Sequence, residues 1–203
     1  MLTIGLTGPS GAGKGSVASL FARYGVPSID TDAVYHRLLV PPSACLDELA
    51  ARFGQVILTS AGTLDRKALA AVVFAPGHET DLSDLNRISH RHVLDEVRRL
   101  LAAYEAEGKP AVLVDAPQLF ESGFDSECDF TLSVLAPREV RMARIMARDG
   151  LDEARATARL DAARPDEFFC ENSDAVILNH GAVEDMDAEV RHLLTLWEVP
   201  HEA

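Results

Sequence analysis

The sequence predicts an α/β fold in which helices cover both faces of a five-stranded parallel sheet. Three observations indicate this fold. Short apolar runs recur without polar alternation, as in strands that are buried on both faces. Segments with helical periodicity lie between these runs, and a glycine-rich turn follows the first of them. Such alternation of strands and helices is typical of doubly wound sheets.

Five segments are expected to form the strands. The first, residues 2–6, ends in a glycine turn, and residues 26–30 are a second, weaker candidate. The clearest run covers residues 111–115 (AVLVD), and the remaining two cover residues 130–135 and 175–178. These runs have at most about eight apolar residues, far fewer than the roughly 20 that span a bilayer.

Six helices are expected between and after the strands. They cover residues 17–23, 36 to about 53, 83 to about 107, 138–148, 152–164 and 187–197. Asp152 follows Gly150 and is expected to cap the fifth of them. No convincing strand lies between residues 34 and 109, so we expect a helical insertion there that contains a substrate site.

Composition and charge restrict the class of protein. The 203 residues suit one α/β domain with insertions. The net charge of −13 disfavours nucleic acids and membrane surfaces as partners, because both are anionic. The three cysteines form no CxxC pair, so neither a zinc site nor a disulfide framework is expected. Without an evident targeting segment, we expect a reduced, cytoplasmic protein.

A glycine-rich loop carries the strongest chemical signal. Residues 8–16 (GPSGAGKGS) match the pattern GxxxxGK, directly after a buried strand and before a helix. Backbone N–H groups of such a loop form a nest for phosphate oxygens, and the helix N-terminus adds its dipole. We therefore expect ATP to be bound by Gly8, Gly11, Ala12, Gly13, Lys14, Gly15 and Ser16. The alternative is an ordinary strand–turn–helix connection.

The metal ligands are less clear than the phosphate ligands. Gly15 stands where the motif has a Ser or Thr that ligates Mg²⁺, and the hydroxyl follows one residue later at Ser16. Adenylate kinases have the same GKG arrangement, so it is direct ligation of the metal by the protein that Gly15 puts in doubt. Asp115 resembles a Walker-B aspartate that holds Mg²⁺ through water. Its alternative role is that of a strand-end turn residue.

Two carboxylates follow the second strand. Asp30 and Asp32 lie at a strand end, where open α/β sheets place their ligands, and share one face if the backbone is extended. A carboxylate there accepts the proton of an attacking hydroxyl or orients the water molecules on Mg²⁺. The alternative for Asp32 is a helix N-cap, because Ala33 starts a helical pattern.

Taken together, the motifs resemble the dephospho-coenzyme A kinase family. The collinear matches are residues 5–8 with the phosphate loop, 29–32 (IDTD), 53–54, 62–69 (GTLDRKAL), 73–74, Leu85-Asn86 with His90, 117–121 (PQLFE), 174–177 and Asn179. The resemblance implies a P-loop NTPase fold. It also implies transfer of the γ-phosphate of ATP to the ribose 3′-hydroxyl of dephospho-CoA, the last step of coenzyme A synthesis.

The resemblance further implies roles for single residues and for regions. Asp32 corresponds to the family's base. The dephospho-CoA site would be lined by Arg66, Leu85, Asn86, His90, Pro117, Leu119 and Glu121. The single domain would have a core at about 1–33, 110–137 and 165–203, a substrate-binding helical region at about 34–109, and a lid at about 138–164.

Arginines are concentrated in the segment assigned to the lid. Arg141, Arg144 and Arg148 are spaced by three and four residues, so they face one side of a helix, and Arg155, Arg159 and Arg164 follow. Arginines of a closing lid stabilise the charge on a transferring phosphoryl group. The resemblance favours Arg144 as a catalytic group and Arg148 as an ATP ligand. A solvated helix face is the alternative for the six together.

Four positions depart from the family pattern. They are Gly15, Arg91 where proline is usual, Gln118 where leucine is typical, and Arg164 where glutamine is common. Two other functions therefore stay open: a nucleoside monophosphate kinase of the same fold, and a catalytically weak ATP-binding regulatory protein. The expected cofactors are ATP and Mg²⁺, and the expected assembly is a monomer or a small homo-oligomer.

Overall fold

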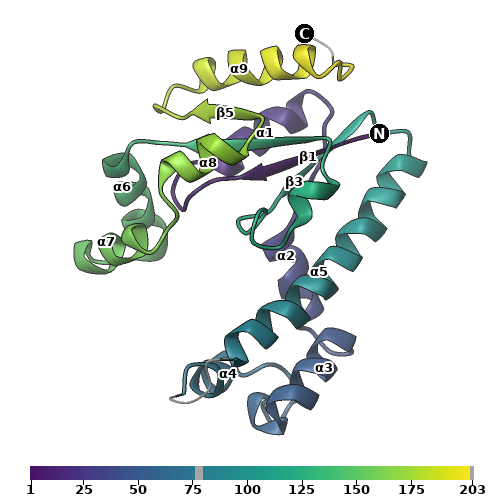
Figure 1. Cartoon of the computed structure of the whole chain (residues 1–203), viewed down its shortest axis with the longest axis vertical. Helices are drawn as coiled ribbons and strands as arrows, with labels where there is room; N and C mark the ends of the chain where they lie inside the picture. Colours follow the sequence, from purple (N-terminus) through teal and green to yellow (C-terminus); the bar gives the residue numbers. More distant parts are fainter. Residues whose placement is uncertain (76–79, 202–203) are drawn as a thin grey trace. The chain divides into compact units, whose positions relative to one another are not determined.

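The computed structural model describes residues 1–75 and 80–201 (Figure 1). The chain forms two compact units. Unit 1 comprises Met1–Ile29 and Leu101–Ala203, and unit 2 comprises Asp30–Leu100. Most of the helical region predicted at 34–109 falls in unit 2. Residues 76–79 of that region and 202–203 of the predicted core lie outside the described residues.

Five strands form one parallel sheet, as predicted, in the order β2-β3-β1-β4-β5. The strands are β1 (Leu2–Thr7), β2 (Ser28–Asp30), β3 (Ala111–Asp115), β4 (Phe130–Leu135) and β5 (Ala175–Leu178). The central strand β1 pairs with β3 and β4, and its register places Leu6 opposite Asp115 and Thr7 opposite Ser133. The carboxyl ends of β3, β1 and β4 therefore meet at one edge of the sheet.

The described part of unit 1 contains five complete helices. They are α1 (Lys14–Arg23), α6 (Arg138–Asp149), α7 (Glu153–Asp161), α8 (Asp166–Asn172) and α9 (Val183–Leu196), with a 3-10 turn η2 (Phe124–Glu127). Among them, α1 and α9 bury the apolar faces of these strands. Helices α1 and α9 pack together in one core that contains Ile4, Phe21 and Trp197. The ring of Trp197 stacks on Phe130 with the centroids 4.8 Å apart. Figure 1 shows α9 running along β5 at the edge of the sheet.

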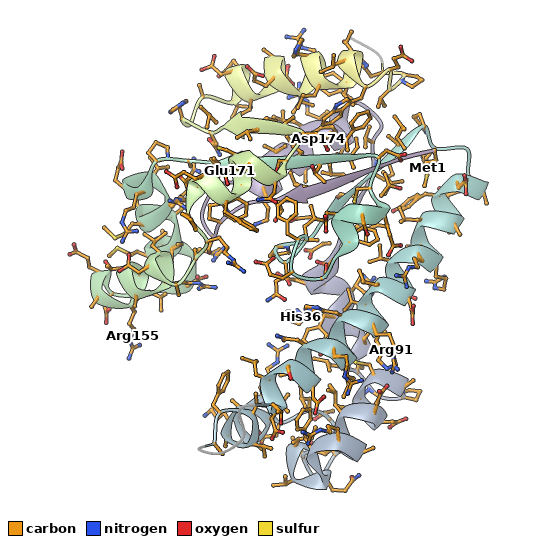
Figure 2. The ribbon with its side chains drawn as sticks, viewed as in Figure 1. Met1, His36, Arg91, Arg155, Glu171 and Asp174 are labelled. Atoms are coloured by element: carbon orange, nitrogen blue, oxygen red, sulfur yellow. The ribbon has the colours of Figure 1, made fainter. Side chains whose placement is uncertain are left out.

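Two aspartates fix the ends of neighbouring strands to each other. Asp174, labelled in Figure 2, accepts hydrogen bonds from the backbone N–H (2.7 Å) and the hydroxyl (2.8 Å) of Thr131. Asp129 accepts one from the N–H of Thr3 at 2.7 Å. These bonds satisfy backbone N–H groups near the entry of β1 and β4.

Helices α6 and α7 form a helical pair with its own small core. Gly150 ends α6 in the left-handed conformation, and the Asp152 side chain accepts a hydrogen bond from the N–H of Arg155 at 2.8 Å. The predicted cap at Asp152 is therefore confirmed. Ile145 of α6 packs against Ala156 and Leu160 of α7. The segment predicted as a lid thus has a fixed internal geometry.

Unit 2 is built from helices. They are α2 (Thr31–Leu38), α3 (Ala44–Phe53), a 3-10 turn η1 (Gln55–Ile57), α4 (Arg66–Val73) and α5 (Asp81–Ala106), the last of which continues into unit 1. Its core includes Leu49, Phe53 and Ile57 together with Leu69 and Ile88. Within the described part of unit 2, the strand-type pairing consists of one antiparallel bridge, between Leu58 and Leu64.

Several predicted boundaries were wrong, each for a local reason. The second strand starts at Ser28 instead of Val26, because Val26 still donates its N–H to Phe21 in the turn that ends α1. The helix predicted from residue 36 to about 53 is two helices, interrupted at Pro41 and Pro42. Proline lacks the N–H that a helix interior needs, so the pair separates α2 from α3.

Two helices were missed, and four start earlier than predicted: α1, α2, α5 and α9, which begins at Val183 instead of residue 187. Helix α1 begins at Lys14 rather than at residue 17, because the phosphate loop leads directly into its first turn. The missed helices are α4 and α8, which have eight and seven residues. Segments of two turns give too few repeats for a clear helical period. No helix in the described part of the chain is both long and apolar enough to cross a membrane.

Candidate active site

The phosphate loop connects β1 to α1, and two of its glycines, Gly8 and Gly13, have no room for a side chain. Gly8 has a φ of 136° and Gly13 one of 101°, in the region that side chains disfavour. A Cβ on Gly8 would lie 2.2 Å from the carbonyl oxygen of Val134 in β4, and one on Gly13 would lie 2.1 Å from Nδ2 of Asn179. The glycines therefore serve both the turn and the close approach of neighbouring segments.

The N-terminus of α1 is arranged to attract an anion. Within the described helix, no acidic residue occupies the first turn and no side chain caps the N-terminus. Its first N–H groups and the helix dipole are thus left for a ligand. Lys14 folds across the loop, and its Nζ donates a hydrogen bond to the carbonyl oxygen of Gly8 at 3.1 Å. A cation and several N–H donors consequently meet at one loop.

Gly15 and Ser16 lie on the open side of this loop. Both residues are exposed, and a Cβ on Gly15 would have no described atom within 4 Å. The carbonyl oxygen of Gly15 accepts a hydrogen bond from the hydroxyl of Ser19 at 2.8 Å. A side chain at position 15 is therefore sterically allowed. In this respect Gly15 differs from Gly8 and Gly13, where an added Cβ would clash.

Arg144 and Asn179 hold the loop from the other side. Arg144 of α6 donates from one guanidinium nitrogen to the carbonyl oxygens of Gly11 and Ala12, both at 3.1 Å. Its other terminal nitrogen donates to Oδ1 of Asn179 at 3.3 Å, and Nδ2 of Asn179 donates to Ala12 at 2.8 Å. Two side chains from distant parts of the sequence thus converge on two loop carbonyls.

Arg148 also reaches the loop, but it is paired with a neighbour. Its guanidinium donates to the hydroxyl of Ser10 at 3.3 Å and to both carboxylate oxygens of Asp149 at 2.8 and 2.9 Å. The hydrogen bond to Asp149 raises the pKa of Arg148, and the same bond, aided by Arg159, lowers the pKa of Asp149. Arg148 therefore stays charged beside the loop.

The remaining arginines of this segment have different surroundings. Arg141 is buried and pairs with Asp166 of α8 at 3.2 Å, and Arg159 pairs with Asp149 at 2.6 Å. Arg155 extends away from α7 with a side chain that is 76% exposed (Figure 2). The six arginines thus do not form one face: Arg144 and Arg148 contact the loop, whereas the contacts described for these three lie elsewhere.

The segment after β3 lies beside the start of the loop. Asp115 ends β3 in register with Leu6, and the hydroxyl of Thr7 lies 3.4 Å from the carbonyl oxygen of Pro117. Pro117 is exposed, whereas Leu119 is fully buried and packs beneath Gly5 of β1. Leu119 is therefore a core residue in this structure and presents no surface to a ligand, contrary to its predicted place in the lining.

Glu121 is tied to one of the departures from the family pattern. Its carboxylate lies 3.5 Å from Nε of Arg164, and the Arg164 guanidinium lies over the ring of Phe168 at 5.0 Å. Phe168 contacts the edge of Phe120 with the ring centroids 5.5 Å apart. The segment 117–121 is thereby joined to the end of the predicted lid and to α8.

Unit 2 contains the other predicted residues. Asp32 lies exposed in the first turn of α2, and the N-cap of that helix is Asp30, whose carboxylate accepts the N–H of Ala33 at 3.0 Å. The alternative role of Asp32 as an N-cap is therefore wrong. So is the expectation of a shared extended face, because the strand ends at Asp30.

Arg66, Leu85 and His90 are placed on two helices of unit 2. Arg66 is exposed at the first position of α4, after the cap Asp65. Leu85 and His90 are partly buried on α5, where Leu85 packs on the core of the unit. Beside them, Arg91 and His92 both contact Glu48 of α3, and Figure 2 shows Arg91 on α5. The departure at Arg91 thus adds an ion pair between two helices of unit 2.

The donor set allows Mg²⁺ but not a site made by the protein alone. Among the described residues, no group of three or more His, Cys, Asp or Glu side chains could hold a metal ion. The exposed hydroxyl of Ser16 and the half-buried carboxylate of Asp115 supply oxygen ligands of the kind Mg²⁺ prefers. Such an ion commonly uses one or two protein oxygens together with substrate phosphates and water, so these residues fit it.

No role was predicted for three residues of this site: Ser10, which belongs to the loop itself, and Asn179 and Asp149, which come from other parts of the chain. Asn179, Ser10 and Asp149 contact the loop or its arginines. A signal for Asn179 was available, because it is the polar residue directly after β5, at the carboxyl edge of a parallel sheet. The contact between Asp149 and Arg148 joins adjacent residues, and no spacing rule indicates it.

Comparisons with known proteins identify the family. A family model described as dephospho-CoA kinase matches residues 2–185. A dephospho-CoA kinase of Corynebacterium glutamicum is 37% identical over 194 residues, which are 96% of this chain and 98% of that protein. The crystal structure of TT1252 from Thermus thermophilus gives a TM-score of 0.78 at 34% identity, covering 96% of this chain and 97% of that one.

A second solved structure carries the family name. The dephospho-CoA kinase from Campylobacter jejuni gives a TM-score of 0.68 at 25% identity and covers 95% of both chains. The sequence and structure comparisons therefore agree over nearly the full length. The chain, with its GKG phosphate loop held by Arg144 and Asn179, belongs to the dephospho-CoA kinase family.

Proposed function

We propose that this protein transfers the γ-phosphate of ATP to the ribose 3′-hydroxyl of dephospho-CoA. One observation carries the proposal: a chain of this family has a complete phosphate loop in front of an uncapped helix N-terminus. Phosphoryl transfer needs little covalent chemistry from the protein, and it depends on positioning and electrostatics. The loop geometry supplies both for the donor nucleotide.

ATP is bound through its phosphates. Its proposed ligands are the N–H groups of the loop at Gly8, Gly11, Ala12, Gly13, Gly15 and Ser16, together with the side chains of Lys14 and Arg148. Lys14 bridges to Gly8 and thus lies across the loop, where an ammonium group neutralises the β- and γ-phosphates. Arg148, which is paired with Asp149 beside Ser10, adds a charge at the loop's rim.

Arg144 is the proposed catalytic arginine. A guanidinium has five N–H donors, and three of them make the described bonds to the loop and Asn179. Two donors are left for an oxygen of the transferring group. Fixing an arginine on the loop before the substrate arrives removes part of the reorganisation that the transition state would otherwise require.

Mg²⁺ would be held by the Ser16 hydroxyl and, through water, by Asp115. When bound, it draws negative charge from the β- and γ-phosphates and so makes the γ-phosphorus easier to attack. Gly15, which cannot offer a hydroxyl, leaves that task to Ser16.

The acceptor is activated by Asp32. Its carboxylate, which is exposed in the first turn of α2, takes the proton of the 3′-hydroxyl as the bond to phosphorus forms. Acceptor contacts are proposed for Arg66, Leu85, His90, Pro117 and Glu121, with Leu119 supporting the 117–121 segment from the core. We further propose a cytoplasmic protein that acts as a monomer or small homo-oligomer.

The test is a coupled ADP-release assay with dephospho-CoA, AMP and CMP offered in parallel. We expect turnover with dephospho-CoA alone. Phosphorylation of AMP or CMP but not of dephospho-CoA would identify a nucleoside monophosphate kinase. Tight ATP binding without transfer to any of the three would identify a regulatory protein.

The base is tested by Asp32→Asn, with Asp47→Asn as the matched control. Asp47 is also an exposed acidic residue in the first turn of a unit 2 helix, so the two variants disturb helix electrostatics alike. We expect Asp32→Asn to lower turnover by roughly 100-fold or more while the Kd for ATP changes less than about threefold. Turnover within about threefold of the parent would show that Asp32 is not the base.

A further inference from the structure

Asn179 occupies a fixed position directly after β5. Its side chain is buried, and the residue is 1% exposed. Its backbone N–H donates to the carbonyl oxygen of Leu135, the last residue of β4, at 2.7 Å. The residue is therefore anchored to the carboxyl edge of the sheet independently of its side chain.

The side-chain amide of Asn179 has a single favourable orientation. Oδ1 faces two donors, the N–H of Gly181 at 3.1 Å and a guanidinium nitrogen of Arg144 at 3.3 Å. Nδ2 faces the carbonyl oxygen of Ala12 at 2.8 Å. A flipped amide would place NH₂ against two donors and oxygen against a carbonyl, so these neighbours define which atom is which.

The contacts of Asn179 and Arg144 fix the direction in which the carbonyl group of Ala12 points. A phosphate nest requires that successive N–H groups point toward the anion, so the carbonyl groups must point away from it. The carbonyl of Ala12 is held by two donors, one from Asn179 and one from Arg144. Gly13 leaves space for the amide, because a Cβ there would lie 2.1 Å from Nδ2.

We propose that Asn179 is a positioning residue for the phosphate loop and for Arg144. It acts on ATP through these two partners: it holds the Ala12 carbonyl away from the anion side and fixes Arg144 against the loop. This inference rests on the binding of ATP phosphates by the loop, which is part of the proposed function. The proposal adds Asn179 to the nucleotide site. This residue follows β5 and lies far from the loop along the chain.

The test uses Asn179→Asp and Asn179→Ala, with Asn172→Ala as the matched control. The aspartate keeps the acceptor toward Arg144 and Gly181, but it replaces the donor to Ala12 by an oxygen and adds a negative charge. The alanine removes these side-chain contacts without adding a charge. Asn172 is an exposed asparagine of unit 1 whose amide also donates to a backbone carbonyl, that of Phe168 at 2.7 Å. It controls for the loss of an asparagine side chain remote from the loop.

Binding of ATP is measured by calorimetry without an acceptor, and steady-state kinetics follow. We expect both Asn179 variants to raise the Kd and the KM for ATP roughly tenfold or more, since the Ala12 carbonyl loses one of the two donors that orient it. The KM for dephospho-CoA should change less than about threefold, and Asn172→Ala should bind ATP like the parent. Because Asn179 and Arg144 act on the same carbonyl, adding Asn179→Ala to Arg144→Ala should weaken ATP binding further by less than tenfold.

Two results would overturn the proposal. One is a folded Asn179→Asp variant that binds ATP within about threefold of the parent. The other is loss of the native Trp197 fluorescence in both Asn179 variants, which would assign a general structural role to the residue. A parent protein that binds ATP yet does not phosphorylate dephospho-CoA refutes the proposed function and leaves this inference standing, since the calorimetric comparison needs no acceptor.

Discussion

Alanine at Gly15 and alanine at Gly13 should change the stability of unit 1 in opposite directions, although both glycines belong to one loop. Gly15 is the second residue of α1 and is exposed, and a Cβ there has no described atom within 4 Å. Gly13 has a φ of 101°, and its Cβ would lie 2.1 Å from Nδ2 of Asn179. The same methyl group therefore meets open space in one case and a buried amide in the other.

The magnitudes follow from these surroundings. Replacing glycine by alanine in a helix stabilises it by up to about 1 kcal/mol, and in a first turn we expect about 0.5 kcal/mol for Gly15→Ala. At Gly13 a left-handed alanine costs about 1–2 kcal/mol. Displacement of Asn179 from Ala12 adds about 1–3 kcal/mol, because the buried amide loses its acceptor and the carbonyl keeps only its bond from Arg144. The expected loss for Gly13→Ala is therefore about 3 kcal/mol.

The chain offers a specific reporter for this experiment. Its one tryptophan, Trp197, is buried in the core of unit 1 and stacked on Phe130, so its fluorescence follows unfolding of that unit. We expect the melting temperature to rise by roughly 1–2 °C for Gly15→Ala and to fall by roughly 6–12 °C for Gly13→Ala. A loss of stability in Gly15→Ala, or none in Gly13→Ala, would refute the reasoning from loop geometry.

Three further predictions concern charges of unit 1 and the thiols of both units. Arg164→Gln should lower the stability of unit 1 by less than about 1 kcal/mol, because the ion pair with Glu121 is partly exposed. The loss of stability should be smaller in 0.5 M salt. A double variant with Glu121→Gln that loses clearly more stability than either single variant would contradict this prediction. The hydrogen bond to Arg148 lowers the pKa of Asp149, so this carboxylate stabilises the fold above its unfolded pKa of about 3.9 and loses that effect as the pH falls through the folded value. Melting curves between pH 7 and 3 should therefore show a smaller acid loss for Asp149→Asn than for the parent, and parallel curves would disprove the assignment. Burial raises the pKa of Cys45 to about 11 and of Cys128 to about 12, whereas Cys170 is exposed. Ellman's reagent at pH 8 should therefore label one thiol of the native protein and three thiols in urea. The native Cys170→Ser variant should show no rapid labelling.

The sheet could be predicted because its strands carry their own signal. Buried parallel strands are apolar on both faces, so the runs at Ala111–Asp115 and Phe130–Leu135 are recognisable without any partner. The loop could be predicted for a similar reason, since its glycines and lysine stand at fixed spacing between a strand and a helix. Residues adjacent in the chain determine both features.

Some helices and helix boundaries could not be predicted, because they depend on short or interrupted sequence patterns. Helices α4 and α8 have too few turns to repeat a period, and prolines 41 and 42 divide a segment whose apolar spacing suggested one helix. Asp30 rather than Asp32 caps α2, because the helix starts at Thr31, directly after the strand, and not at Ala33. Such boundaries are decided by which backbone groups find partners, and the composition of a window does not show this.

By itself the sequence determined the strand and helix pattern, the phosphate loop and, through its collinear motifs, the family. Only the tertiary structure decided that Asn179 and Arg144 share the carbonyl of Ala12, that Leu119 is core, and that Arg164 pairs with Glu121. The physical reason is distance along the chain. Local spacing encodes a loop or a helix, whereas a contact between residues 12 and 179 exists only after the sheet has brought two strand ends to one edge.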